Sequence, residues 1–153
     1  MDICVRCFLL DSEDRILLVK HGNKLPWVLP GGHVEDIDTT IYDTLKREIN
    51  EELGIDILIL GVENQFDQKG VRSLPLPVSI HTVRYEHKTR GIIEKFEYVF
   101  FARAKGEIDE DSDELVATKR MEMDEILALD DEEIPPFIKQ ILDQNIDFLD
   151  VLG

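Results

Sequence analysis

The chain has 153 residues, of which 43% are apolar, so it is long enough to bury one sizeable core and too short for two ordinary domains. Its formal net charge of −16 and sequence pI of about 4.5 argue against stable binding to nucleic acids or anionic membranes, because both need clustered Lys and Arg. No segment approaches the roughly 18 uninterrupted apolar residues of a membrane span, and the first residues do not resemble a signal peptide. We therefore expect a single domain over residues 1–153, no membrane or stable nucleic-acid partner, and a cytoplasmic location.

The first segments predict a hairpin of two strands. Residues 3–10 and 15–20 are rich in aliphatic and β-branched residues and flank the polar turn 11–14. Cys4 and Cys7 lie three positions apart in the first strand, so their side chains should point to opposite faces. Because no second cysteine pair exists to complete a zinc site, we expect two buried free thiols.

The next segment, residues 25–32, predicts an extended stretch that ends in a turn at Pro30, Gly31 and Gly32. Paired glycines allow the backbone to approach a ligand closely. A helix should follow, with Asp38, Thr39 or Thr40 as its N-cap and Gly54 at its C-terminus. Its apolar stripe repeats every four residues: Ile41, Leu45, Ile49 and Leu53.

The C-terminal part of this helix, residues 47–55, has the sequence REINEELGI and carries three crowded carboxylates, Glu48, Glu51 and Glu52. Like charges at this spacing destabilise an isolated helix by roughly 0.2–0.5 kcal/mol per pair. A solvated acidic face is the simplest interpretation. However, at about 100° per residue Glu48 and Glu52 lie at the edge of the apolar stripe, where a carboxylate is costly to ionise unless it is paired or bound to metal. Together with the glycine pair, this placement favours a site for Mg²⁺ or Mn²⁺.

The rest of the chain predicts further strands and two helices. Strands are expected at residues 56–62, 78–85 and 96–104, with prolines in residues 73–79 that start or edge the second of them. The acidic residues 109–114 predict a loop, and a short helix is expected at 123–129. A longer helix opened by Pro135-Pro136 has one mostly apolar face: Ile138, Ile141, Leu142, Asn145, Leu149 and Leu152.

The glycine pair and the helix together resemble the signature of the Nudix hydrolases. That pattern is a Gly, five residues, a Glu, seven residues, then Arg-Glu, an aliphatic, any residue, Glu-Glu, any residue, Gly and an aliphatic. The residues that fit it here are Gly32, Arg47, Glu48, Ile49, Glu51, Glu52, Gly54 and Ile55. Two departures occur: Asp38 replaces the first Glu, and eight residues instead of seven separate it from Arg47. In the family that Glu orients the loop and its Arg, so the change bears on loop geometry more than on chemistry.

The resemblance implies an α/β fold, a mixed sheet sandwiched between helices. It also implies metal-dependent hydrolysis of a diphosphate bond, in a nucleoside diphosphate linked to another moiety or in a nucleoside triphosphate. Gly32, through its carbonyl, and Glu48, Glu51 and Glu52 would bind Mg²⁺, or Mn²⁺ in its place. Some members of the family have a fourth carboxylate outside the signature; the candidates here are Glu97, Glu110 and Glu114, each of which also fits an ordinary surface position. Glu51 or Glu52 would accept a proton from the attacking water, and Arg47 would hold the carboxylates in place.

The partner implied is a small nucleotide-type substrate, and homodimers are common among relatives. Candidate cations for an anionic substrate are Arg6, Lys20, Arg72, Arg84 and Lys88, none of which the sequence singles out. One alternative is a nucleotide-binding regulatory module, but such modules commonly lose the signature carboxylates that this chain keeps. Another is diphosphate isomerisation, which would need a longer chain and a catalytic Cys in its own motif.

Overall fold

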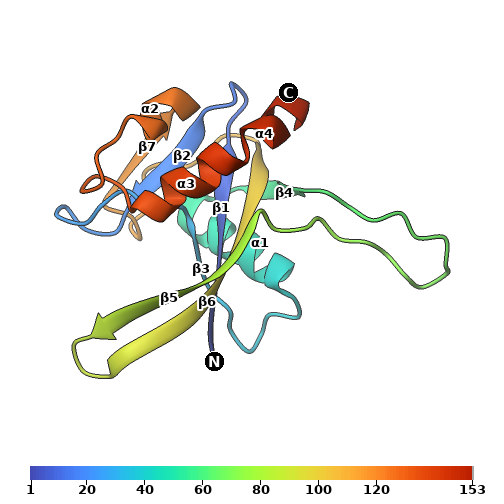
Figure 1. The fold of residues 1–153 in the computed structure, drawn as a ribbon, viewed down its shortest axis with the longest axis horizontal. Helices are drawn as coiled ribbons and strands as arrows, with labels where there is room; N and C mark the ends of the chain where they lie inside the picture. Colours follow the sequence, from blue (N-terminus) through green and yellow to red (C-terminus); the bar gives the residue numbers. More distant parts are fainter. Residues whose placement is uncertain (153) are drawn as a thin grey trace.

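The computed structural model describes residues 1–152, apart from the side chain of Leu152 (Figure 1). The elements in chain order are β1 (Asp2–Leu10), β2 (Ile16–Lys20), β3 (Gly31–His33), α1 (Ile41–Leu53), β4 (Asp56–Leu60), β5 (Ser79–His87), β6 (Gly91–Lys105), β7 (Ala117–Met121), α2 (Met123–Leu127), α3 (Pro136–Gln144) and α4 (Ile146–Leu152). The expected contribution of Leu152 to an apolar face, and the end of the expected domain at Gly153, lie outside what is described.

The seven strands form one mixed sheet, which confirms the predicted fold class. Its order is β4-β6-β1-β2-β7, with β3 also paired to β1 and β5 to β6. The central pair, β1 and β6, is parallel, and the other pairs are antiparallel. One edge of the long strand β6 pairs with β5 along its first part and with β4 along its last part, so β6 joins a projecting hairpin to the body of the sheet (Figure 1).

Side chains of alternating strand positions build a core on each face of the sheet. Val5, Cys7 and Leu9 of β1 pack with Leu45 and Ile49 of α1 on one face. The intervening side chains of β1 pack on the other face, against α2, α3 and α4: the apolar cluster there includes Phe8, Leu10, Phe101, Ile126 and Ile138. Full burial of each such large apolar side chain contributes roughly 1.5–3 kcal/mol. Cys4 and Cys7 are both buried and free, as expected.

The stretch Pro30-Gly31-Gly32 was predicted to be a turn, and this was wrong. Gly31 and Gly32 belong to β3, which pairs antiparallel with β1 and places Gly32 opposite Val5. Gly31 has φ 147°, which L side chains rarely adopt, and a Cβ there would lie 2.7 Å from the Arg6 Cα. Gly31 therefore allows the close packing of the β3 and β1 backbones.

Two further features differ from expectation. The polar strand β7 was not predicted, and it forms by pairing with β2 along the register Ile16↔Met121 to Lys20↔Ala117. The predicted long C-terminal helix is divided into α3 and α4 at Asn145, whose side-chain amide donates to the Ile141 carbonyl at 2.7 Å. That bond and a non-helical backbone at Asn145 (φ −120°, ψ 20°) end α3 before α4 begins. Over the described residues, the helices are too short or too polar for any of them to span a bilayer.

Candidate metal and catalytic site

Helix α1 is fixed at both ends as the sequence predicted. The hydroxyl of Thr40, the N-cap, accepts from the Asp43 N–H at 3.2 Å. Gly54 ends the helix in the left-handed conformation, with φ 66°. The Asp109 N–H then donates to the Leu53 carbonyl at 2.9 Å, which attaches the loop 107–116 to this end of the helix. The apolar stripe of α1 is buried, so the neighbouring side chains of Glu52 and Glu48 lie at the boundary of the core. Glu52 is buried there and Glu48 is half-buried.

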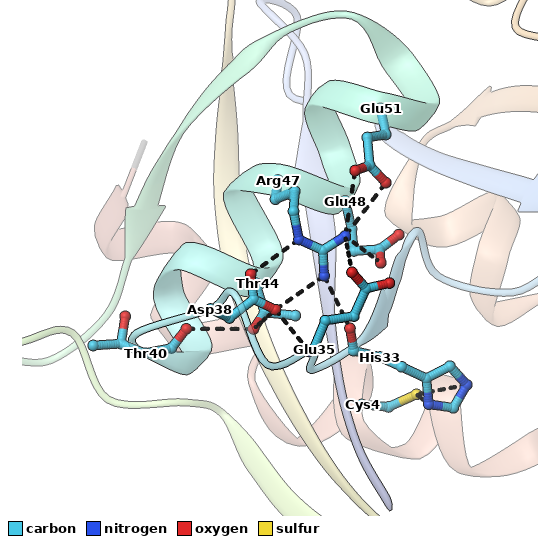
Figure 2. A network of polar contacts seen from close by, with 9 residues as sticks. All are labelled: Cys4, His33, Glu35, Asp38, Thr40, Thr44, Arg47, Glu48 and Glu51. Atoms are coloured by element: carbon cyan, nitrogen blue, oxygen red, sulfur yellow. Dashed lines mark hydrogen bonds and ion pairs between the residues drawn. The ribbon is translucent and has the colours of Figure 1, made fainter.

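Arg47 is the centre of the polar network at the site (Figure 2). Its Nε and Nη2 donate to the two carboxylate oxygens of Asp38, both at 2.9 Å, and Nη2 also donates to the His33 carbonyl at 3.1 Å. Its Nη1 donates to Glu48 at 3.0 Å and to Glu51 at 3.3 Å. Hydrogen bonding to Asp38 raises the pKa of Arg47 further above its ordinary value. Arg47 thus links the loop between β3 and α1 to Glu48 and Glu51, two of the three glutamates predicted to bind metal.

Asp38, which stands where the signature has a Glu, binds Arg47 with both of its carboxylate oxygens. Its side chain is 3% exposed, and it also accepts hydrogen bonds from the Thr44 hydroxyl and the Glu35 N–H, both at 2.9 Å. The hydrogen bonds from Arg47 hold its pKa well below the usual range. Asp38 therefore binds Arg47 with both oxygens, although its side chain is one methylene shorter than a Glu side chain and the spacing to Arg47 is one residue longer than in the signature.

Glu52 is the buried carboxylate of the site. It is 5% exposed, and its Oε2 has no hydrogen-bond partner among the described residues. Burial raises the pKa of Glu52 to about 7, and the negative charges of Glu48 and Glu114 add to the effect. A buried carboxyl oxygen without a partner is costly unless something absent from the polypeptide binds it.

Gly32 and Glu48 are in close contact, which brings β3 against α1. A Cβ on Gly32 would lie 2.6 Å from Glu48 Oε1, so only a glycine leaves this carboxylate its position. Burial also raises the pKa of Glu48. Over residues 1–152 no three acidic, His or Cys side chains form a ready ligand set, since Arg47 draws Glu48 and Glu51 to itself. The donors nevertheless fit a hard divalent cation: carboxylates, a nearby backbone carbonyl and an unpartnered buried oxygen.

The three candidates for a fourth carboxylate lie in different places. Glu97 is on the opposite face of the sheet from α1 and is 3% exposed. Glu110 accepts from the Thr118 hydroxyl at 3.2 Å and lies 3.5 Å from Arg120. Glu114 is exposed, and its charge raises the pKa of Glu52. Of the three, Glu114 is therefore the one whose charge acts on the predicted metal ligands.

Glu97 instead lies between two cations, Arg6 and Lys95, and the imidazole of His81. Arg6 Nε donates to it at 3.2 Å, His81 Nε2 lies 3.1 Å away and Lys95 Nζ lies 3.4 Å away. Burial acts to raise the pKa of Glu97, but the charges of Arg6 and Lys95 outweigh burial and lower it. Sequence reasoning singled out Arg6 but missed Lys95 and His81. The available signal was the two-residue spacing of Lys95 and Glu97, which puts both on one face of β6.

Arg6, Lys95 and Glu97 form the polar side of a cavity of about 150 Å³. Its other lining residues, which include Leu29 and Phe137, are apolar. Arg6 links the cavity to the loop of the site, because its Nη1 donates to the Leu29 carbonyl at 3.0 Å and its backbone packs against Gly31. Two other cations considered from the sequence have different contacts: Lys20 lies over the Trp27 ring at 4.8 Å, and Arg84 pairs with Glu94 at 3.1 Å.

Comparison with known proteins gives a family match and several similar structures. A sequence model of the NUDIX domain matches residues 2–142. A NUDIX-family hydrolase from Clostridium perfringens has a TM-score of 0.69 at 20% identity, covering 99% of this chain and 97% of that one. The mutator protein MutT of Bacillus halodurans has a TM-score of 0.64 at 23% identity, covering 94% and 80%.

An ADP-ribose pyrophosphatase from Streptococcus suis is 26% identical, with a TM-score of 0.52 and coverage of 80% of this chain and 75% of that one. A search of curated protein sequences finds no match.

Proposed function

The chain belongs to the Nudix hydrolase family, and we propose that it hydrolyses a diphosphate bond in a small nucleotide with the help of Mg²⁺ or Mn²⁺. The substrate is a nucleoside diphosphate linked to another group, or a nucleoside triphosphate. The observation that supports this most directly is the unpartnered buried oxygen of Glu52 beside Glu48 and Gly32. A cytoplasmic location remains a prediction.

Gly32, Glu48, Glu51 and Glu52 are the residues that would hold the metal. A bound divalent ion would shield the phosphoryl charge and lower the pKa of the attacking water. Glu48 and Glu51 would turn from Arg47 toward that ion. Arg47 keeps its two bonds to Asp38 and its bond to the His33 carbonyl, so the loop stays attached to the helix during this exchange.

Glu51 or Glu52 accepts the proton of the attacking water, and the surroundings favour Glu52. A general base works best when its pKa lies near the working pH, and burial raises the pKa of Glu52 to about 7. Glu51 has a side chain that is 47% exposed and lies on the solvent side of the helix.

The uncleaved part of the substrate would enter the cavity beside Arg6 and Lys95. Apolar walls such as Leu29 and Phe137 suit a flat ring, and the charged side suits polar edges of a base or sugar. The ADP-ribose pyrophosphatase among the similar structures makes nucleoside diphosphate sugars a first choice for assay.

The test is a panel of nucleoside triphosphates, nucleotide sugars, dinucleoside polyphosphates and dinucleotide cofactors, assayed for phosphate-containing products with and without Mg²⁺ or Mn²⁺. For the best substrate, Glu52→Gln should lower kcat by about 10²–10⁴-fold, since the variant can neither accept a proton nor bind metal as an anion. Glu132→Gln, at an exposed glutamate outside the site, is the matched control and should leave kcat unchanged. Metal binding without hydrolysis of any compound in the panel would contradict the proposal and favour a nucleotide-sensing module.

A further inference from the structure

A second cavity, of about 350 Å³, lies where the β5–β6 hairpin passes the start of β1, and we call it the hairpin cavity. Its lining combines residues of β1, β3 and the hairpin, among them Asp2, His33, Tyr85, His87 and Arg90. Tyr85 and His87 are an even number of positions from His81, so they lie on the face of the sheet where His81 meets Glu97. The hairpin cavity and the smaller cavity beside Glu97 therefore open on the same face.

Lys95 lies between these two cavities. It lines the smaller one, and its Nζ is 5.8 Å from the ring centroid of Tyr85, which lines the hairpin cavity. The same Nζ is 3.9 Å from Cys4 Sγ, and this sulfur lies 3.4 Å from Nδ1 of His33 in the wall of the hairpin cavity. The two cavities are thus neighbours, separated by a few side chains.

Strand β3 places the proposed metal site beside both cavities. Its first residue, Gly31, pairs with Arg6, which lines the smaller cavity. Its last residue, His33, lines the hairpin cavity, and Figure 2 shows the His33 ring directed away from Arg47 and toward Cys4. Gly32, the proposed metal ligand, lies between them. A substrate whose diphosphate lies at Gly32 can therefore place one of its two linked groups in each cavity.

The hairpin is cationic in an acidic protein. The chain has a net charge of −16, yet residues 79–95 carry more cations than anions: Arg84, Lys88, Arg90 and Lys95 against Glu86 and Glu94. Arg90 contributes its guanidinium to the hairpin cavity. The cavity is therefore a place where an anion is attracted locally although the whole chain repels it.

The turn of the hairpin also fixes a donor in this cavity. His87 Nδ1 accepts from the backbone N–H groups of Thr89 at 3.2 Å and Arg90 at 3.3 Å, so the ring proton lies on Nε2. Asp2 is a carboxylate in the lining, but its Oδ2 lies 3.8 Å from Arg90 Nη2, too far for a hydrogen bond. Arg90 is 61% exposed and Asp2 37%, so this pair is weak and an incoming anion can take its place.

We propose that the hairpin cavity is a second anion subsite, which binds an acidic group on the moiety that the diphosphate links to the nucleoside. Arg90 donates to two oxygens of this group and His87 Nε2 to one, which suits a carboxylate or a phosphate. The proposal rests on the proposed function and narrows its substrate class. Nucleotide sugars whose sugar bears an acidic group should be preferred over neutral ones.

The test uses pairs of nucleotide sugars that differ only at C6 of the sugar, a carboxylate in one and a hydroxymethyl group in the other. The pairs are UDP-glucuronate with UDP-glucose and GDP-mannuronate with GDP-mannose. With Mg²⁺, the wild-type kcat/KM should be about tenfold or more higher for the acidic member, chiefly through a lower KM.

Two variants of the subsite should bring this ratio close to one. Arg90→Gln removes the guanidinium, and His87→Asn removes the Nε2 donor while keeping an oxygen that can accept from the turn. Lys88→Gln is the matched control, because it removes a cation from the same turn at an exposed residue that does not line the cavity, and it should keep the wild-type ratio.

Binding without turnover separates this proposal from the hydrolytic function. In the presence of a chelator, isothermal titration calorimetry should give a Kd about tenfold lower for the acidic member, with the same response to the three variants. Hydrolysis of both members with equal kcat/KM, or a preference that Arg90→Gln keeps, would overturn the subsite and leave the hydrolase intact. Hydrolysis of no compound, with tighter binding of the acidic member through Arg90, would support the subsite and contradict the hydrolase.

NADPH and NADH test where the acidic group lies, since their difference is a phosphate on the nucleoside. The wild type should not discriminate between them by more than Arg90→Gln does. A preference for NADPH that Arg90→Gln abolishes, without one for either acidic sugar, would overturn the assignment of the cavity to the second moiety.

Discussion

Asp38 holds Arg47 with both carboxylate oxygens while it accepts two further hydrogen bonds from its own loop and from α1. Both partners are largely shielded from solvent, with side-chain exposures of 3% for Asp38 and 16% for Arg47. Loss of one partner from such a pair leaves the other charge poorly compensated, which costs far more than loss of a surface pair.

Asp38→Asn should therefore lower the free energy of unfolding by about 3 kcal/mol in urea titrations without metal. The matched control is Asp14→Asn, which removes an equally short ion pair to Arg103 from a carboxylate that is 62% exposed, and should cost less than about 1 kcal/mol. If both variants lost the same free energy of unfolding, Glu48 and Glu51 would be able to hold Arg47 in place without Asp38.

Glu52 makes the stability of the metal-free protein depend on pH. Burial raises its pKa from 4.5 to about 7, so between these values the folded protein keeps a proton that the unfolded chain has released. Its contribution to stability is fully present below pH 4.5 and is lost as the pH rises through about 7. With a chelator present, we expect the free energy of unfolding to fall by up to about 3 kcal/mol from this group between acidic and mildly alkaline pH.

Glu52→Gln removes this titration, so the pH dependence should be correspondingly flatter in the variant. The comparison is made by urea unfolding at several pH values. If the wild type and Glu52→Gln lose stability in parallel, Glu52 titrates near its ordinary value and the inferred desolvation is absent.

At the scale of elements, the contact between β3 and α1 sets the site, and it passes through Gly32. A methyl group at this position would meet the carboxylate of Glu48, which is the movable end of a flexible side chain. Gly32→Ala should therefore leave the fold intact but lower Mn²⁺ affinity by about tenfold, measured by isothermal titration calorimetry.

Gly54→Ala, at the C-cap of α1, is the matched control. Its left-handed backbone makes alanine cost roughly 1–2 kcal/mol of stability, while the glutamates keep their places. Gly32→Ala should thus lower metal affinity, whereas Gly54→Ala should lower the free energy of unfolding. Loss of Mn²⁺ affinity in Gly54→Ala, or unchanged affinity in Gly32→Ala, would contradict this division.

Helix α1 could be predicted from sequence because its cap, apolar stripe and terminal glycine all lie within fifteen positions and agree. β3 could not, since Pro-Gly-Gly has no strand propensity and pairs only because β1 offers it a backbone partner. The face of the sheet on which Glu97 lies could not be predicted either, because a shift of one residue in the pairing register of β6 would place its side chain on the face that α1 covers. The division of α3 from α4 depends on one side-chain hydrogen bond of Asn145, which helical periodicity does not reveal.

Over the whole molecule, composition predicted one acidic domain but not how its charge is distributed. The net charge of −16 hides a hairpin with more cations than anions, and the cations Arg6 and Lys95 meet Glu97 through the register of β1 and β6. The three glutamates that we propose as metal ligands could be singled out because they lie about one helical turn apart. The cavity was not found, because its residues are distant in the sequence and meet through the sheet.

The parallel pairing of β1 with β6 determines when this protein is able to fold during its synthesis. Arg6 and Glu97 are 91 positions apart in the chain, yet they are bonded neighbours across the two central strands. As the ribosome delivers the chain from its N-terminus, β1 emerges early and has no central partner until β6 has followed. The first apolar strand must wait through most of translation, so the nascent chain has a long period in which chaperones can bind it.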